Sequence, residues 1–535
     1  MFQSAGGLQS LLKEGSRHYS GLEEAMLKNI DACKQLSTIT RTSLGPHGMN
    51  KMVINAHEKL FVTSDAATIL KELEVVHPAA KLLVLAAKMQ ESEVGDGTNL
   101  VVVLAGELLK LAEELVQTGL HPSDILSGYE KAAKKAEASL PDLTIYTVAD
   151  THDKAEVTKV LTPVLASKIY GYESHLASVV TEACLAVTEN ACPFDLDNVR
   201  VAKLLGGSLP QSSVVRGLVL TRGAEGMVTR AINCKVAVFN NPLDPQYSDT
   251  KGTVLITKAE QLTSYNKSEE DVAKRLIDEL VEAGVKVVIA GASVSEMCMH
   301  FLELSQIMVV KVPSKFELRR VCKALKAVPL VRLGAPTAEE MGLADEISVQ
   351  EIASHKVVIL RRDTEASKVA TIVLRASTQN LLDDAERAAD DAINAFRMMK
   401  RDGRYVVGAG GSEAMLARTI REYGSTEPGL DQYAIMKFAQ ALEVVPKTLA
   451  ENAGLNANDL LARLYAENSA SSGIDIEEGT VKDMKGLVMD HLESKVWALR
   501  LASEAALTVL KVDQIIMAKP SGGPKPPEQK PQEDD

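Results

Sequence analysis

Residues 93–109 read EVGDGTNLVVVLAGELL, and the turn Gly95-Asp96-Gly97-Thr98 near their start is the best point from which to interpret the chain. An Ala-rich apolar run precedes this turn, and an apolar run with helical spacing follows it from Leu100 to Val116. Two glycines allow a tight turn, and Thr98 stands where a helix N-cap is expected. A helix N-terminus attracts phosphate, and the carboxylate of Asp96 suits Mg²⁺. The stretch therefore indicates a Mg-nucleotide loop, although a plain Gly-rich turn with an ordinary capping Thr fits the same letters.

The composition is that of a globular protein with several domains. The chain has 535 residues, of which 46% are apolar, and this length is too great for one core. Its 59 basic and 72 acidic residues leave a net charge of −13, which argues against nucleic acid as the main partner. The six cysteines form no CxxC pair, so we expect neither a metal site nor a disulfide framework, and a reducing cytosol fits best. We expect no signal segment and no membrane helix, because no run approaches the ~18 apolar residues that a span needs.

The pattern of apolar and β-branched residues changes twice along the chain. Residues up to about 143 are mainly helical in pattern, with two short predicted strands at 52–54 and 60–62. Short β-branched runs then alternate with helices, which predicts an α/β domain with a sheet; these runs are 236–239, 287–290, 309–312 and 356–359. Helical texture returns after residue 375, so we expect nested domains in which the first and last segments pack together. The Pro-rich tail 519–535 is predicted to be disordered.

Several enzyme classes lack their motifs. The chain contains no GxxxxGK[ST], HExxH or GxSxG, which excludes a P-loop enzyme and leaves zinc and serine hydrolases unsupported. A dinucleotide fingerprint starting at Gly95 or Gly408 would need its third glycine at Leu100 or Glu413. Neither position is glycine, so a Rossmann site is also disfavoured.

Three polar turns remain as candidates for one site. Residues 44–48, Asp65 and 95–98 each lie at a predicted helix boundary within the first helical domain. Such turns can converge on one polyphosphate. The pair Asp390-Asp391 is far away in the sequence on a charged helix, and its spacing alone is typical of a solvated face.

At this stage the residues can be compared with a known family. RTSLGPHGMNKM (41–52) resembles the RTSLGPKGMDKM segment of group II chaperonins, TSDAATIL (63–70) resembles TNDGATIL, and 93–109 resembles EVGDGTTSVVVLAGELL. Further segments resemble the family in order along the chain: 205–208 (the AGGS hinge), 251–256 (the start of the apical protrusion), Asp391-Ala392 (HDA), 408–413 (GGGATE), 451–455 (ENAGLD) and 472–475 (YGID). The chain is thus identified as a member of the group II chaperonins over nearly its whole length. Residues 50–55, 65–70 and 95–99 most resemble one subunit type of the eukaryotic cytosolic chaperonin.

The resemblance implies a multidomain α and α/β fold of the GroEL-like type. It implies a helical equatorial ATPase domain (1–143 and 404–535), a small intermediate domain (144–211 and 372–403), and an α/β apical domain (212–371) with a helical protrusion near 244–262. The implied assembly is a double ring in which each ring has eight different subunits, so that this chain is joined by seven other subunit types. Implied clients are unfolded proteins such as actin and tubulin, and prefoldin-type co-chaperones are implied partners. Client contacts are expected around Phe316 to Leu325 or on the protrusion.

The resemblance also implies a role for each site residue, with ATP and Mg²⁺ as ligands. Asp96 is expected to bind Mg²⁺, Asp391 to polarise the attacking water, and Asp65 to help position that water. Ser167 and Lys168 resemble a nucleotide-sensing pair. The remaining implied contacts to phosphates, ribose and base are Leu44, Gly45, Gly97, Thr98, Asn99, Gly408, Gly410, Gly473, Ile474 and Asp490.

Four positions depart from the family pattern: His47 replaces Lys, Ala67 replaces Gly, Asn99 replaces Thr, and Asp390 replaces His. His47 exchanges a permanent cation for a group that is mostly neutral at pH 7. We therefore expect nucleotide binding with slow hydrolysis or exchange. A non-hydrolysing scaffold subunit is the alternative, against which the intact Asp65, Asp96 and Asp391 count. A free-standing ATPase or small-molecule kinase lacks a substrate-pocket signature.

Overall fold

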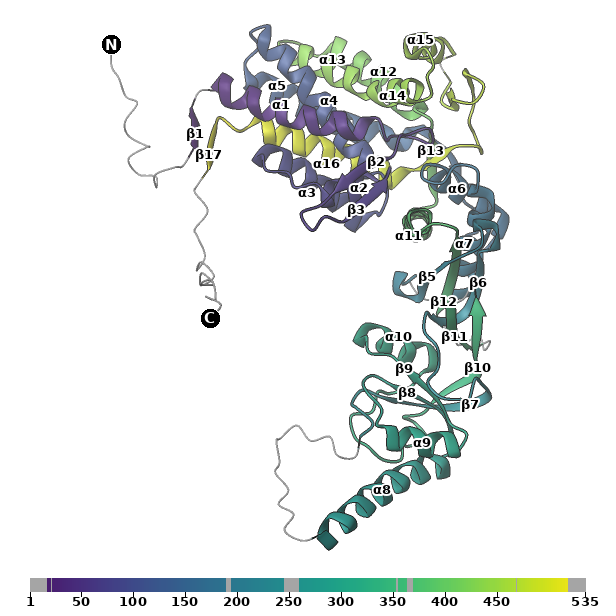
Figure 1. Cartoon of the computed structure of the whole chain (residues 1–535). Helices are drawn as coiled ribbons and strands as arrows, with labels where there is room; N and C mark the ends of the chain where they lie inside the picture. Colours follow the sequence, from purple (N-terminus) through teal and green to yellow (C-terminus); the bar gives the residue numbers. More distant parts are fainter. Residues whose placement is uncertain are drawn as a thin grey trace.

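The computed structural model describes residues 17–20, 22–188, 194–244, 259–352, 355–362, 369–467 and 469–517. The predicted disordered tail and residues 245–258 of the predicted protrusion lie outside these described residues. The described chain is elongated, with a body of helices at one end and a sheet with long helix α8 at the other (Figure 1). This mixture of an all-helical part and an α/β part confirms the predicted fold class.

Helices from both halves of the chain form the body that carries residues 95–98. Their bounds are α1 (Leu22–Arg41), α2 (Ala66–Glu72), α3 (Pro78–Glu93), α4 (Thr98–Gln117), α5 (Pro122–Ser139), α12 (Gly411–Thr426), α13 (Asp431–Leu442), α14 (Val444–Asn452), α15 (Ala457–Glu467) and α16 (Leu492–Leu510), with the 3₁₀ turn η1 (Leu140–Leu143) after α5. One core joins side chains from residues 26–140 with side chains from residues 406–510. Small residues such as Ala105 and Ala112 on α4 are fully buried in it, which lets the helices approach closely.

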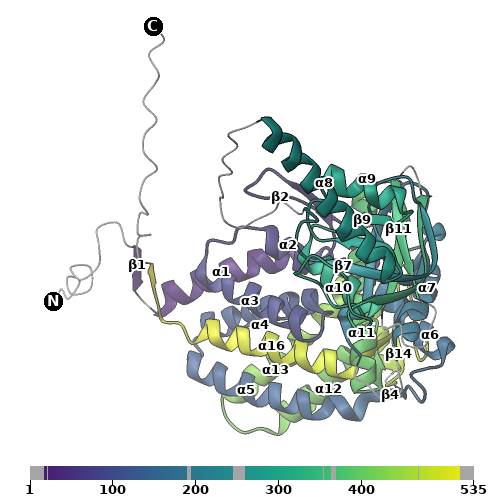
Figure 2. The same cartoon turned by 90° about the horizontal axis from the view of Figure 1, so that it is seen from below.

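Three two-stranded antiparallel ribbons accompany the helices of this body. The predicted strands at 52–54 and 60–62 are confirmed as an antiparallel hairpin, β2 (Lys51–Ile54) with β3 (Leu60–Thr63). A second hairpin joins β14 (Ser472–Asp475) to β15 (Thr480–Asp483). The third ribbon pairs β1 (Arg17–Ser20) with β17 (Gln514–Met517), and it lies beside the start of α1 and the end of α16 in both views (Figures 1 and 2).

Three helices form a middle part next to this body. α6 (Lys154–Ala166), α7 (Glu173–Val187) and α11 (Gln379–Arg401) share a second core. A three-stranded sheet follows α11 directly and ties it to the body: β13 (Arg404–Val407) lies between β4 (Thr144–Thr147) and β16 (Met489–His491). α11 thereby lies next to the helical body that carries the loop at 95–98 (Figure 1).

An eight-stranded sheet extends from the middle part to the far end of the molecule. Its strand order is β5-β12-β6-β11-β10-β7-β8-β9, with bounds β5 (Val199–Leu205), β6 (Ser213–Leu220), β7 (Arg230–Phe239), β8 (Val285–Ala290), β9 (Met308–Lys311), β10 (Gly342–Ile352), β11 (His355–Arg361) and β12 (Ala370–Ala376). The predicted runs 236–239, 287–290 and 356–359 lie wholly in it, and the run 309–312 extends one residue beyond β9. Helices α8 (Ala259–Glu282), α9 (Glu296–Leu304) and α10 (Lys315–Leu325) gather around β7–β9, and η2 (Leu196–Asn198) and η3 (Leu209–Gln211) flank β5.

Candidate functional site

The loop at residues 95–98 joins the end of α3 to the start of α4. Gly97 is the N-cap of α4 and has a left-handed backbone with φ of 79°, a conformation in which a side chain is strained. The sequence-based placement of Thr98 at the N-cap is wrong, because Gly97 takes that position and Thr98 is the first helical residue. No side chain caps the helix at Gly97, so the first N–H groups of α4 remain available to an anion.

Asp96 points its carboxylate back at this loop. Its Oδ1 accepts a hydrogen bond of 2.6 Å from the N–H of Gly97. Burial raises the pKa of Asp96, and the negative charges of Asp490 and Asp65 add to this shift, whereas Lys168 and the N–H of Gly97 oppose it. A buried carboxylate with unfavourable like-charged neighbours is well suited to receive a cation.

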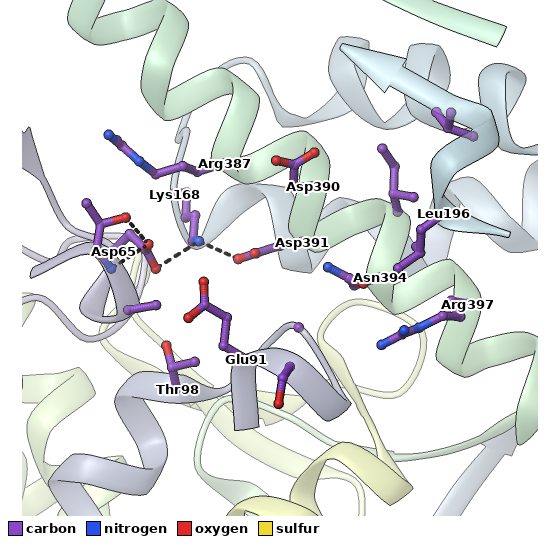
Figure 3. Close-up of a pocket in the computed structure, with 16 residues that line it drawn as sticks. Asp65, Glu91, Thr98, Lys168, Leu196, Arg387, Asp390, Asp391, Asn394 and Arg397 are labelled. Carbon is purple, nitrogen blue, oxygen red and sulfur yellow. Dashed lines mark hydrogen bonds and ion pairs between the residues drawn. The ribbon is translucent and has the colours of Figure 1, made fainter. Parts of the chain in front are cut away.

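A lysine links Asp65 and Asp391, the two carboxylates to which the family resemblance assigns catalytic roles (Figure 3). The ammonium of Lys168 lies 3.1 Å from Oδ1 of Asp65 and forms a second ion pair with Oδ2 of Asp391. Asp65 is the N-cap of α2, and its Oδ2 accepts a hydrogen bond from the N–H of Thr68 at 3.0 Å. Asp391 comes from α11, more than three hundred residues away in sequence, and its side chain is only 15% exposed. The solvated-face interpretation is therefore wrong for Asp391, whereas its neighbour Asp390 is exposed.

The three charged groups differ in how their environment changes their pKa values. Burial works against the charge of Lys168, but Asp391 and Asp65 outweigh it and raise the pKa of the ammonium. Burial alone would raise the pKa of Asp65, yet Lys168 and the hydrogen bonds from Thr68 hold it below its usual range. Burial raises the pKa of Asp391 well above its usual range, and the charges of Asp96 and Asp65 add to this effect although Lys168 opposes it. Asp391 is therefore the group of the three best suited to take up a proton.

The loop borders two cavities. The first, of about 410 Å³, contains the Lys168 cluster and is lined also by Gly95, Thr98 and α11; Glu91 points into it as well (Figure 3). The second, of about 300 Å³, is mostly apolar and lies on the other side of the loop. Eight residues that the sequence indicates as nucleotide contacts line this second cavity: Leu44, Gly45, Asp96, Gly97, Ser167, Gly410, Ile474 and Asp490.

Three predicted contacts do not line either cavity. The amide of Asn99 turns toward Ser43, with Nδ2 at 3.4 Å from its Oγ. Gly408 and Gly473 contact each other, since a Cβ placed on Gly473 would lie 3.2 Å from the carbonyl oxygen of Gly408. Gly408 is fixed there by its N–H, which donates to the carbonyl of Val488 at 3.1 Å.

Sequence reasoning missed Lys495 and Glu413, which form a polar network with Ser412 and the predicted Asp490 in the wall of the second cavity. The ammonium of Lys495 lies 2.6 Å from Glu413, 2.7 Å from Ser412 and 2.8 Å from Asp490. Burial opposes the charge of Lys495, but Asp490 and Glu413 outweigh it and raise its pKa. A lysine among the buried positions of α16 is a sequence signal that, with its helical spacing, points to such a network.

Gln90 on α3 is a second missed residue. It is fully buried, and its Nε2 lies 2.8 Å from the carbonyl oxygen of Asp96 and 3.3 Å from that of Ser494. One side chain thus ties the loop at residues 95–98 to the start of α16. Its position in the buried stripe Leu83, Ala86, Ala87, Gln90 marks it as a polar residue at a core position.

The donor set fits a magnesium ion that is carried by phosphate rather than held by protein alone. Within the described ranges, no group of three or more His, Cys, Asp or Glu side chains is arranged to hold a metal ion. Three carboxylates surround one ammonium at the loop, which leaves an excess of negative charge. Mg²⁺ typically binds through one or two carboxylates together with substrate phosphates and water.

Comparison with known proteins identifies the family of this chain. A model of the TCP-1/cpn60 chaperonin family matches residues 36–520. The chain belongs to this family. Among chaperonins, it is 53% identical over 526 residues to the T-complex protein 1 subunit theta of Arabidopsis thaliana, covering 97% of this chain and 96% of that one. It is 49% identical over 534 residues to the theta subunit of Dictyostelium discoideum (99% of each chain), and 48% identical over 537 residues to that of Homo sapiens (99% and 98%).

These chaperonin relatives are all named as theta subunits, the type that residues 50–55, 65–70 and 95–99 resemble. The similarity covers nearly the full length of each chain, so it includes both the helical body and the large sheet. Among the helices of the described ranges, none combines the length and apolar character that a membrane span requires.

Proposed function

We propose that this chain is a theta-type subunit of a hetero-oligomeric chaperonin ring, and that it binds and hydrolyses Mg-ATP to drive enclosure of unfolded protein. The observation that carries the proposal is the Lys168 bridge between Asp65 on the helical body and Asp391 on α11. Through it, a carboxylate from a distant segment stands in the same cavity as the loop at residues 95–98. A nucleotide site that includes a residue of a second part of the chain can couple its occupancy to the movement of that part.

The residues have separable tasks. The first-turn N–H groups of α4 hold phosphate oxygens, and Asp65 orients a water together with Lys168. Asp391, whose pKa is raised, polarises that water and takes its proton. Phosphoryl transfer depends on such positioning and on charge neutralisation more than on covalent help. The apolar second cavity, with Leu44, Ile474 and Asp490 in its walls, receives the nucleoside.

Asp96 is the residue that would hold Mg²⁺, and the ion, when bound, neutralises charge on the phosphates. The burial of this carboxylate, which raises its pKa, and its negatively charged neighbours Asp490 and Asp65 support this role.

The test is to measure the chemical state of nucleotide on this chain alone. An affinity-tagged, full-length chain is purified in its native assembly, photo-crosslinked to radiolabelled 8-azido-ATP, and analysed for azido-ATP and azido-ADP. We expect time-dependent azido-ADP on the unmodified chain and on Asp383→Asn, whose side chain lies on the same helix as Asp391 but pairs with Lys203 and does not line the first cavity. We expect Asp391→Asn to crosslink normally and to retain azido-ATP. Absence of crosslinking to the unmodified chain would refute the proposal.

A second candidate, a scaffold subunit that binds nucleotide without turnover, is favoured by two departures from the family pattern. His47 is exposed, and its ring centroid lies 5.4 Å from that of Tyr170 rather than in either cavity. Asn99 leaves its buried Oδ1 without a hydrogen-bond partner in the described part of the chain. Azido-ATP that persists unchanged on the unmodified chain would identify this candidate.

Ring assembly is supported by the exposed β ribbons. Met52 and Ile54 on the β2–β3 hairpin are 69% and 66% exposed, which is unusual for strand residues of this type. Within the described residues the β1–β17 ribbon has two strands, and the edges of such a ribbon can pair with another chain. We infer that these ribbons contact neighbouring subunits in a double eight-membered ring that contains seven other subunit types. Sedimentation near a megadalton is expected, and a free monomer would contradict this inference.

The domain boundaries, clients and location are part of the same proposal. We assign 1–143 and 404–535 to an equatorial domain, 144–211 and 372–403 to an intermediate domain, and 212–371 to an apical domain. Phe316 on α10 is 73% exposed and supports client contact there. Unfolded proteins of the actin and tubulin type are the proposed clients, prefoldin-type proteins the proposed co-chaperones, and the cytosol the proposed location.

A further inference from the structure

The face of α11 that looks onto the loop carries more than Asp391. Arg387, Asp391, Asn394 and Arg397 follow one another at spacings of three or four residues and line the first cavity together (Figure 3). Arg387 reaches Thr63 with Nη1 at 3.2 Å from Oγ1 and pairs with Asp384. The functions proposed above use only Asp391, so the other side chains need a separate explanation.

Arg397 contacts the end of the helix that leads into the loop. Its Nη2 donates a hydrogen bond of 2.8 Å to the carbonyl oxygen of Glu93, the last residue of α3. Carbonyl groups at a helix C-terminus lack intrahelical partners and carry partial negative charge, which a guanidinium stabilises. Glu93 precedes Gly95 by two residues, so this hydrogen bond holds the chain just before the proposed phosphate loop at residues 95–98.

Asn394 packs directly on the loop itself. A Cβ placed on Gly95 would lie 2.3 Å from Cγ of Asn394, which means that the amide occupies the space that any larger residue would need. The backbone of Gly95 is left-handed, with φ of 86°. The loop and α11 are therefore in contact at a position where neither can shift without moving the other.

We propose that Arg397 and Asn394 form a latch that positions Asp391 over the phosphate loop. They are positioning residues, and this inference rests on the proposed ATP hydrolysis. Arg397 lies six residues beyond Asp391, which is about 9 Å along a helix. Two anchors at this separation, the Lys168 ion pair and the Glu93 carbonyl, fix both the distance of α11 from the loop and its rotation about its own axis. A movement of the loop on phosphate binding is thereby passed to the helix that carries Asp391.

The test compares Arg397→Met with a matched variant on the same helix, Arg401→Met, whose side chain is exposed in the last turn of α11. The full-length chain in its native assembly is crosslinked to 8-azido-ATP as above. For Arg397→Met we expect crosslinking within twofold of the unmodified chain and formation of azido-ADP slowed about tenfold. Arg397→Lys, which keeps a donor and a charge, should recover most of the rate, and Arg401→Met should match the unmodified chain.

A double variant separates positioning from a general structural role. If Arg397 acts through Asp391, Arg397→Met added to Asp391→Asn should cause no further slowing. Hydrogen exchange of peptides covering 93–99 should be faster in Arg397→Met in both backgrounds. An unchanged rate in Arg397→Met, or a further tenfold loss in the Asp391→Asn background, would overturn the latch while leaving the proposed ATP hydrolysis intact. Lack of any azido-ADP on the unmodified chain would instead refute the proposed function.

Discussion

Replacing Lys168 by Met removes the one ammonium that Asp65 and Asp391 share. The side chains of Lys168, Asp65 and Asp391 are 14%, 11% and 15% exposed, so the variant would leave two nearly buried carboxylates facing each other across the cavity. Removing one partner of a buried ion pair typically costs 3–5 kcal/mol. Because each group keeps slight access to solvent, we take the lower end, about 3 kcal/mol. That corresponds to a fall of about 6–12 °C in the melting temperature of a cooperative unit of 150–250 residues.

The loss should depend on pH in a defined direction. In the unmodified chain, the raised pKa of Lys168 means that its stabilisation is complete below its unfolded pKa and is lost only as the pH rises through the folded value. The lowered pKa of Asp65 contributes stability above its unfolded pKa, and acid removes this only as the pH falls through the folded value. Without Lys168, burial raises the pKa of both carboxylates, and protonation relieves the cost. The variant should therefore regain stability on acidification from pH 7.5 to 5.5, more than the unmodified chain does.

The assay heats the native assembly and follows this chain through its own peptides in the soluble fraction by mass spectrometry. Lys203→Met is the matched control, because Lys203 also holds two carboxylates of α11, Asp383 and Glu386, each at 2.7 Å. Those three side chains are 30%, 32% and 34% exposed, so we expect a loss of about 1 kcal/mol or less. Equal losses in the two variants, or a loss in Lys168→Met that does not change between the two pH values, would refute the reasoning.

Four further changes test other parts of the site. Asp391→Asn should slow azido-ADP formation at least about a hundredfold with normal crosslinking; a normal rate would exclude it as the base. Gly410→Ala should weaken crosslinking strongly, because the φ of Gly410 is 76° and an added Cβ would lie 2.7 Å from Cβ of Pro446. The control Gly119→Ala should bind nucleotide normally, because Gly119 has a similar φ of 93° but open space around it. His47→Lys should speed hydrolysis if loss of a cation explains slow turnover, and an unchanged rate would contradict that explanation. Ile54→Asp on the exposed hairpin should reduce the chain's share of the large particle in sedimentation, and full incorporation would argue against the hairpin as a contact.

Local signals in the sequence account for much of the fold near the loop. Helical spacing from Leu100 to Val116 predicted α4, which runs from Thr98 to Gln117. The cap was misplaced by one residue because Thr is a common N-cap, whereas a left-handed Gly97 serves equally well here. N-cap preference is defined for each residue type separately, so it does not predict which of two neighbouring residues takes the N-cap position.

The approach of Asp391 to the loop had no local signal. Charged residues are spread along the whole sequence of α11, so the pattern does not distinguish Asp391 from its acidic neighbours. The packing of α11 on α6 and α7 decides which of these carboxylates is buried. Resemblance to a family supplied this residue, and it also supplied Lys168. Arg397 was not found in either way, because its partner is a backbone carbonyl, and backbone groups leave no trace in the letters of a sequence.

The helical core that joins residues 26–140 to residues 406–510 has a consequence for how the chain is made. Ribosomes add about 5–20 residues each second, so the first helices emerge tens of seconds before α12 to α16 are synthesised. Throughout that interval, the apolar faces of α1, α3 and α4 lack the helices that will cover them. A chain built in this way exposes apolar surface during its own synthesis, which favours aggregation until α16 has left the ribosome and can pack against the first helices.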